Sequence, residues 1–91
     1  AVLHGISGVH DCAVFGIPDA EFGEALMAVV EPQPGVTLEP GGIRTALKAH
    51  LADYKVPRHI EIRTQLPRED SGKIFKRRLR DPYWEAAGRK I

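Results

Sequence analysis

The residue of this chain best suited to chemistry is a lysine that follows a glycine in a polar loop. In the segment 67–73, Ser71 and Gly72 stand directly before Lys73. An ammonium on a long stem suits contact with a phosphate or carboxylate, and glycine lets a backbone turn sharply beside a ligand. The segment is not a Walker loop, because the earlier glycine is missing and Ile74 occupies the Ser/Thr position. A solvated surface loop can show the same Gly-Lys pair, so its surroundings must decide.

Positive charge gathers behind this lysine. Residues 1–67 contain five Lys/Arg and eight Asp/Glu, whereas residues 68–91 contain eight and four. Five of those eight basic residues lie within residues 73–80. Such a segment can meet phosphates, another domain, an anionic membrane or nucleic acid, and it is equally typical of a solvated face. Lys76 and Arg77, which lie nearest the loop, are candidate binding residues beside Ser71 and Gly72.

The overall composition is that of an ordinary globular domain. The chain has 91 residues, a formal net charge of +1, 43% hydrophobic residues and 27% charged residues. Its single cysteine, Cys12, excludes an intramolecular disulfide and favours the reducing cytoplasm. The spacing of Cys12 with His4 and His10 matches no standard metal site, and no apolar run is long enough to span a membrane. We therefore expect a cytoplasmic domain without a metal centre or transmembrane segment.

Apolar runs and breakers predict three short strands. Residues 12–17 and 25–30 are apolar runs, which indicates buried strands, and the short turn between them favours an antiparallel pair. Residues 59–63 alternate apolar and polar side chains, which predicts a third strand with Ile60 and Ile62 inward.

Helical patterns lie before, between and after these strands. Residues 1–6 are typical of a helix end. Residues 43–54 place Ile43, Leu47, Leu51 and Tyr54 at helical spacing, with Val56-Pro57 expected to end the helix. Residues 74–80 predict a helix, and Asp81-Pro82 predicts the N-cap and first turn of a separate short helix through Trp84. The expected fold class is α+β, a small three-stranded sheet with helices packed on its faces.

Two motifs together resemble a known superfamily. Residues 54–58 read Tyr-Lys-Val-Pro-Arg, and residues 67–73 follow with Pro-x-x-x-x-Gly-Lys. This combination resembles the C-terminal domain of the adenylate-forming (acyl-CoA synthetase, AMP-binding) superfamily, which includes acyl-CoA synthetases, nonribosomal peptide adenylation domains and luciferases. Residues 9–19 and 22–24 are similar to that domain's first strands and turn. The ending at residues 81–84 looks most like a fatty-acyl-CoA ligase.

The resemblance implies a two-step, ATP-dependent acid–thiol ligase. A carboxylic acid such as a fatty acid reacts with ATP to give an acyl-adenylate and pyrophosphate, and the acyl group then passes to coenzyme A (CoA). It implies that Lys73 is the adenylation lysine and that residues 1–91 are the mobile C-terminal catalytic domain. ATP, CoA and Mg²⁺ would be bound mainly by an N-terminal domain, the partner of this one, which is absent from these residues. The fragment alone is therefore expected to be inactive.

Two alternatives stay open from the sequence. Within the superfamily, the chain could belong to an adenylation domain that serves a carrier protein instead of CoA. From another class, residues 73–80 could form a small basic nucleic-acid-binding module. That module would need interleaved aromatic residues, and only Phe75 is present, so we expect no nucleic-acid partner.

Overall fold

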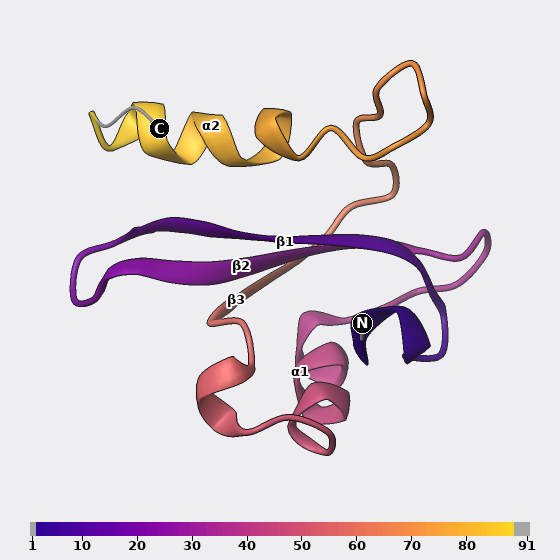
Figure 1. Cartoon of the computed structure of the whole chain (residues 1–91). Coiled ribbons are helices and arrows are strands. Elements are labelled where there is room, and N and C mark those ends of the chain that lie inside the picture. Colours follow the sequence, from indigo (N-terminus) through magenta and orange to yellow (C-terminus); the bar gives the residue numbers. More distant parts are fainter. Residues whose placement is uncertain (1, 89–91) are drawn as a thin grey trace.

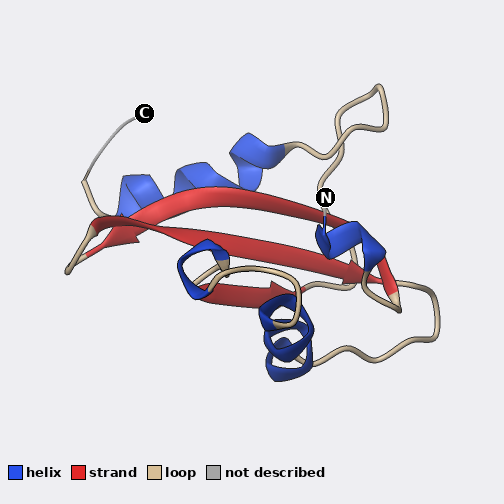
Figure 2. Ribbon diagram, turned by 60° about the horizontal axis from the view of Figure 1, so that its bottom comes forward, coloured by secondary structure: helices blue, strands red, loops and turns tan. Residues whose placement is uncertain are grey.

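The computed structural model describes residues 2–88, and it shows a three-stranded sheet with helices on both faces (Figure 1, Figure 2). The elements in chain order are η1 (Val2–Gly5), β1 (Val9–Asp19), β2 (Gly23–Pro32), α1 (Pro40–Lys48), η2 (Asp53–Lys55), β3 (His59–Ile62) and α2 (Lys76–Ala86). The sheet order is β1-β2-β3. The predicted α+β class with three strands is confirmed.

The strands pair in two different ways. β1 and β2 form an antiparallel hairpin whose tight turn is fixed by the Asp19 carboxylate, which accepts hydrogen bonds from the backbone N–H groups of Glu21 and Phe22. β2 and β3 run parallel, from Met27 beside His59 to Val30 beside Ile62. A parallel pair needs a crossover connection, and α1 lies in it. The predicted antiparallel pair is confirmed; both strands extend beyond their apolar runs, because their polar ends also pair.

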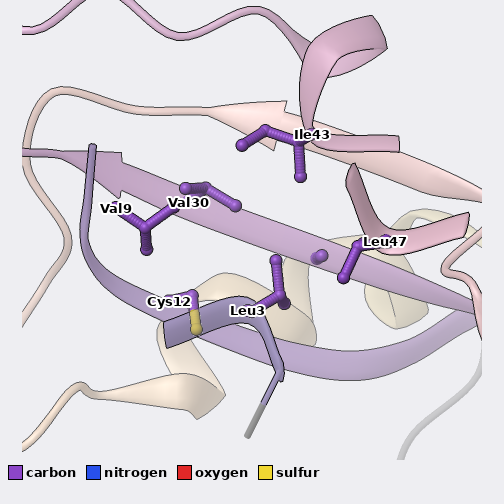
Figure 3. Close-up of a cluster of buried hydrophobic side chains, with 7 residues drawn as sticks. Leu3, Val9, Cys12, Val30, Ile43 and Leu47 are labelled. Atoms are coloured by element: carbon purple, nitrogen blue, oxygen red, sulfur yellow. The ribbon is translucent and has the colours of Figure 1, made fainter. Parts of the chain in front are cut away.

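The sheet separates two hydrophobic clusters. One lies between the sheet and the η1–α1 side and contains Leu3, Val9, Cys12, Ala28, Val30, Ile43 and Leu47 (Figure 3). The other lies on the α2 side and contains Ala13, Phe15, Ile17, Met27, Val29, Leu66 and Leu79. Burial on both faces explains why residues 27–30 form a continuous apolar run.

The prediction that Tyr54 belongs to the buried helical stripe is wrong. α1 ends at Lys48, where the N–H of His50 bonds the carbonyl of Leu47 in a tighter turn. Tyr54 then lies in η2 with 81% of its surface exposed. The apolar spacing continues past the point at which the backbone leaves the helix.

The prediction of a separate short helix at Asp81-Pro82 is also wrong. α2 is one helix that contains Pro82. Leu79 and Trp84, before and after the proline, are both buried, and the Trp84 indole N–H donates to the carbonyl of Gly16 on β1 at 2.9 Å. Packing on the sheet therefore holds the helix continuous across a residue that lacks a backbone donor.

The expected helix end at residues 1–6 is a short 3-10 helix, η1. Leu3 is buried and Ile6 packs against the first cluster, whereas Val2 is exposed. Ala1 lies outside the described residues.

Candidate functional site

Residues 67–75 form a small hairpin that presents Lys73. Arg68 and Ile74 face each other across an antiparallel bridge, and the N–H of Glu69 bonds the carbonyl of Lys73 at 2.8 Å. The turn closes with Gly72, whose N–H bonds the carbonyl of Glu69 at 2.8 Å and whose φ is +89°. That angle suits glycine and strains other residues. The predicted loop is thus an ordered turn.

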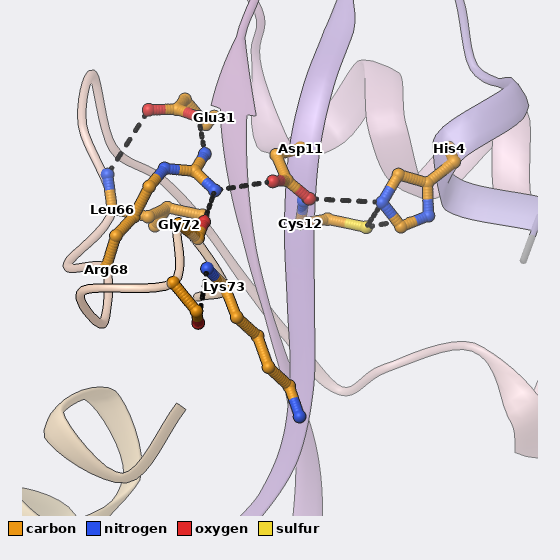
Figure 4. Close-up of polar contacts among 9 residues, drawn as sticks. His4, Asp11, Cys12, Glu31, Leu66, Arg68, Gly72 and Lys73 are labelled. Carbon is orange, nitrogen blue, oxygen red and sulfur yellow. Dashed lines mark hydrogen bonds and ion pairs between the residues drawn. The ribbon is translucent and has the colours of Figure 1, made fainter. Parts of the chain in front are cut away.

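The Lys73 side chain is exposed at the end of this turn. Figure 4 shows it extending away from the polar contacts around Arg68. Its ammonium has no ion-pair or hydrogen-bond partner among residues 2–88, while its backbone N–H lies 3.5 Å from the Ser71 hydroxyl oxygen. The structure therefore brings Ser71, Gly72 and Lys73 together on a fixed backbone with a free cation.

Arg68 joins the hairpin to the sheet. Its Nη1 donates to Asp11 Oδ2 on β1 at 3.0 Å, and its Nη2 donates to Glu31 Oε1 on β2 at 2.8 Å (Figure 4). Nη1 also donates to the carbonyl of Gly72 at 3.1 Å. One guanidinium thus contacts two strands and the residue before Lys73.

The charges of this network shift each other's protonation. Burial acts to raise the pKa of Asp11, but hydrogen bonds from His4, the Cys12 N–H and Arg68, with the Arg68 charge, hold it below its ordinary value of 3.8. The hydrogen bond to Asp11 and the neighbouring Glu31 raise the pKa of Arg68 against a smaller effect of burial. Burial, followed by the Asp11 charge, raises the pKa of the Cys12 thiol above 9.0. The ion pairs therefore persist at neutral pH and the thiol stays protonated.

Lys76 and Arg77 begin α2, directly after the hairpin. Both are exposed, and neither forms a salt bridge among residues 2–88. Arg78 lies over the ring of Phe75, 5.1 Å from its centroid. This basic start of α2 is close to Lys73 in sequence but has no anchor to the sheet through its charges.

Sequence reasoning missed Arg68, Asp11 and Glu31 as parts of the site. Arg68 lies within the segment that the sequence singled out, but its partners are 57 and 37 residues away. The one available signal was Glu31, a carboxylate directly after the apolar run of a buried strand, because buried carboxylates require a cationic or hydrogen-bonding partner.

A hollow of about 590 Å³ lies near the β1–β2 turn, away from the Lys73 hairpin. Its lining includes Phe22, Arg44, Lys48, Tyr54 and Arg58. Arg58 lies over the Phe22 ring at 4.6 Å from its centroid, and Arg44 donates to the carbonyl of Pro57 at 2.8 Å. Elsewhere, Cys12 Sγ lies 3.6 Å from His4 Nε2. Among residues 2–88 no three His, Cys, Asp or Glu side chains gather closely enough to hold a metal ion.

Comparisons with known proteins identify the class of protein to which this fold and hairpin belong. Residues 1–73 match the family of AMP-binding enzyme C-terminal domains, and the chain belongs to this family. Within residues 2–88, no helix has the length and apolar character needed to cross a bilayer.

Relatives of known activity cover nearly the whole chain. A fatty acid–[acyl-carrier-protein] ligase, ScoC, of Streptomyces coeruleorubidus is 40% identical over 90 residues, which are 99% of this chain and 17% of that protein. A long-chain-fatty-acid–CoA ligase of Salmonella typhimurium is 40% identical over 84 residues, 91% of this chain and 14% of that protein. The solved fatty acyl CoA synthetase of Mycobacterium tuberculosis superposes with a TM-score of 0.80 at 33% identity, covering 93% of this chain and 17% of that one. The chain thus spans about one sixth of its relatives' length.

Proposed function

We propose that this chain is the mobile C-terminal domain of an ATP-dependent acyl-CoA ligase and that Lys73 is its adenylation lysine. The observation that carries the proposal is the unpaired, exposed Lys73 ammonium on a hairpin whose backbone is fixed. Membership of the AMP-binding C-terminal family and the names of the relatives support the same activity.

The first half-reaction explains the need for such a lysine. An oxygen of the substrate carboxylate forms a bond to the α-phosphorus of ATP, and the bond from that phosphorus to the pyrophosphate breaks. Both reacting groups are anions. A cation between them offsets their repulsion and stabilises the charge that develops at the α-phosphate. Lys73 has a side chain long enough to enter a cleft in another domain, and it has no ion pair within residues 2–88 that must be broken first.

The second half-reaction requires a different surface. The CoA sulfur forms a bond to the acyl carbon and its proton is released, while the acyl–phosphate bond breaks and AMP leaves. Lys73 has no part in this step if the domain has turned away from the cleft. The exposed cations Lys76 and Arg77, beside Ser71 and Gly72, are available to bind phosphate groups of CoA or the N-terminal domain, and we propose this weaker role for them.

An N-terminal domain is a necessary part of this proposal. The chain covers 14–17% of the relatives described above, and residues 2–88 contain no cluster that could hold a metal ion. We therefore place the main contacts to ATP, to the Mg²⁺ that accompanies it and to the carboxylic acid in that domain. A cytoplasmic location fits the supply of ATP and CoA and stays part of the proposal.

A carrier protein is the second candidate acceptor. The match to ScoC, whose name describes a fatty acid–[acyl-carrier-protein] ligase, favours it specifically. Both acceptors present a thiol, so the chemistry of transfer is the same.

The full-length protein that contains this chain tests the proposal with two assays. A panel of fatty and aromatic acids should stimulate ATP–pyrophosphate exchange, and CoA should then be consumed in proportion to AMP formed. Transfer to a phosphopantetheinylated carrier protein but not to CoA would favour the second acceptor. No exchange with any acid would overturn the ligase assignment. The 91-residue chain alone should release no pyrophosphate.

A further inference from the structure

Two carboxylates face each other directly across the β1–β2 hairpin. Asp11 and Glu31 are register partners, at a point where a β-bulge shifts the pairing between Val9 and Asp11. Like charges opposite each other on one face of a sheet are destabilising, and a bulge is a means of re-aiming a side chain. The strands therefore bring together two negative groups that need a cation.

Both carboxylates are held by groups other than Arg68. Glu31 is only 7% exposed, and its Oε2 accepts the N–H of Leu66 at 3.3 Å. Asp11 Oδ1 accepts the N–H of Cys12 at 2.8 Å and lies 3.2 Å from His4 Nε2 (Figure 4). The two acceptors therefore have contacts that do not depend on Arg68.

Stability by itself is a weak reason for such an arrangement. Arg68 and Asp11 are partly exposed, and ion pairs in such positions contribute little. For the more buried Glu31, desolvation offsets much of the attraction. A planar guanidinium, however, can bridge two carboxylates in one fixed geometry. The network therefore gives a defined position to the chain segment that contains Arg68.

That segment is the Lys73 hairpin. Arg68 is paired with Ile74, the residue after Lys73, and its Nη1 also holds the carbonyl of Gly72, the residue before Lys73. Side chains alternate along a strand, so Arg68 can fix one face of the hairpin to the sheet while Lys73 leaves from the other. The backbone on both sides of the lysine is therefore tied to β1 and β2.

We propose that Arg68 is a positioning residue for adenylation. It acts by binding Asp11 and Glu31 and thereby holding the backbone around Lys73 in a fixed position on the sheet. This inference rests on the proposed function of Lys73. A lysine has four rotatable side-chain bonds, so its ammonium reaches a defined point reliably only when its backbone is fixed. Small misplacements of a catalytic group cost large factors in rate.

The test measures both half-reactions in the full-length ligase with Arg68→Ala, Arg68→Lys and Asp11→Asn. Arg68→Ala should slow ATP–pyrophosphate exchange about 10–100-fold while transfer from supplied acyl-adenylate to CoA stays within about twofold. Arg68→Lys keeps the charge but loses the planar guanidinium that contacts both carboxylates. It should recover part of the rate of ATP–pyrophosphate exchange.

Asp11→Asn should show an intermediate loss of this rate. It should add little to Arg68→Ala in the double variant, because the two residues act as one unit. Arg63→Ala, an exposed arginine without a salt bridge among residues 2–88, is the matched control and should leave both rates unchanged.

Hydrogen exchange supplies a readout that does not depend on activity. In Arg68→Ala the backbone amides of Glu69, Gly72 and Phe75, which are hydrogen-bonded within the hairpin, should exchange faster, whereas in Lys73→Ala they should not. Three results in Arg68→Ala would each overturn the positioning role. They are equal loss of both half-reactions, a wild-type rate of ATP–pyrophosphate exchange, and unchanged protection of these amides. If Arg68→Ala does not fold, Arg68→Lys and Asp11→Asn decide by the same criteria.

The outcomes separate the two proposals. Loss of ATP–pyrophosphate exchange in Lys73→Ala with a normal rate in Arg68→Ala removes only the positioning role. A normal rate of ATP–pyrophosphate exchange in Lys73→Ala removes the proposed function of Lys73 itself.

Discussion

The Lys73 hairpin and the basic start of α2 are neighbours that the sequence presents as one positive segment, residues 73–80. The structure divides them. The hairpin has one free cation on a backbone tied to two strands through Arg68, whereas the start of α2 has several exposed cations without salt bridges among residues 2–88. The number of charges in a segment is therefore a poor guide to which residue can take part in a reaction. A charge can act on a reacting bond when it is held close to that bond, whereas an exposed charge away from it is screened by solvent.

The sharpest test of this difference is Lys73→Ala in the full-length protein that contains this chain. Loss of one electrostatic stabiliser of a transition state costs about 10²–10³ in rate, and we expect that loss in ATP–pyrophosphate exchange. Transfer from supplied acyl-adenylate to CoA should survive. The same preparations should be assayed for both steps, because a folding defect lowers them together. Equal losses would rule out a role specific to adenylation.

A smaller effect is expected from the start of α2. Arg77→Ala should leave ATP–pyrophosphate exchange within about tenfold of wild type, because an exposed charge of this kind is screened by solvent. If Arg77 meets phosphate groups of CoA, the KM for CoA should rise while kcat for adenylation stays. Steady-state kinetics with varied CoA measures both. A loss as large as that of Lys73→Ala would erase the distinction between the two regions.

The comparison also predicts that α2 is held on the sheet by its buried side chains, Leu79 and Trp84, more than by its charged residues. Trp84→Phe removes the hydrogen bond to the carbonyl of Gly16, which should lower the free energy of unfolding by about 1 kcal/mol. Urea unfolding measures this change. The ratio of the two half-reaction rates should stay that of wild type, in contrast to Lys73→Ala. A changed ratio would mean that the position of α2 also sets the chemistry.

The smallest effect concerns pH. The pKa of Asp11 is lowered in the folded state, so its carboxylate stabilises the fold at pH values above its ordinary pKa of 3.8, and this contribution is lost as the pH falls through the lowered value. Because Asp11 is 26% exposed, we expect Asp11→Asn to cost less than about 1 kcal/mol at pH 7. Urea unfolding at pH 7 and pH 3 should show the difference between variant and wild type shrinking at the lower pH. A difference that grows on acidification contradicts the ion-pair explanation.

Local patterns in the sequence determined the buried strands and the chemical character of the loop. The apolar runs at residues 12–17 and 25–30, with the breakers between them, predict an antiparallel hairpin, and the structure has it. The Gly-Lys pair at the end of a polar segment made Lys73 a candidate, and its side chain is exposed in the structure. These features depend on neighbours in the chain, so side-chain type and spacing are sufficient to predict them.

Only the tertiary structure decided the rest. The parallel pairing of β2 with β3, the continuation of α2 through Pro82 and the exposure of Tyr54 depend on contacts between distant segments. The Arg68 network is of the same kind, because its partners come from two strands far away in the chain. A sequence pattern shows which side chains can be buried or charged, and it does not show which of them meet. The packing of both faces of the sheet brings Asp11 and Glu31 to the Arg68 guanidinium, which also bonds the carbonyl of Gly72 beside Lys73.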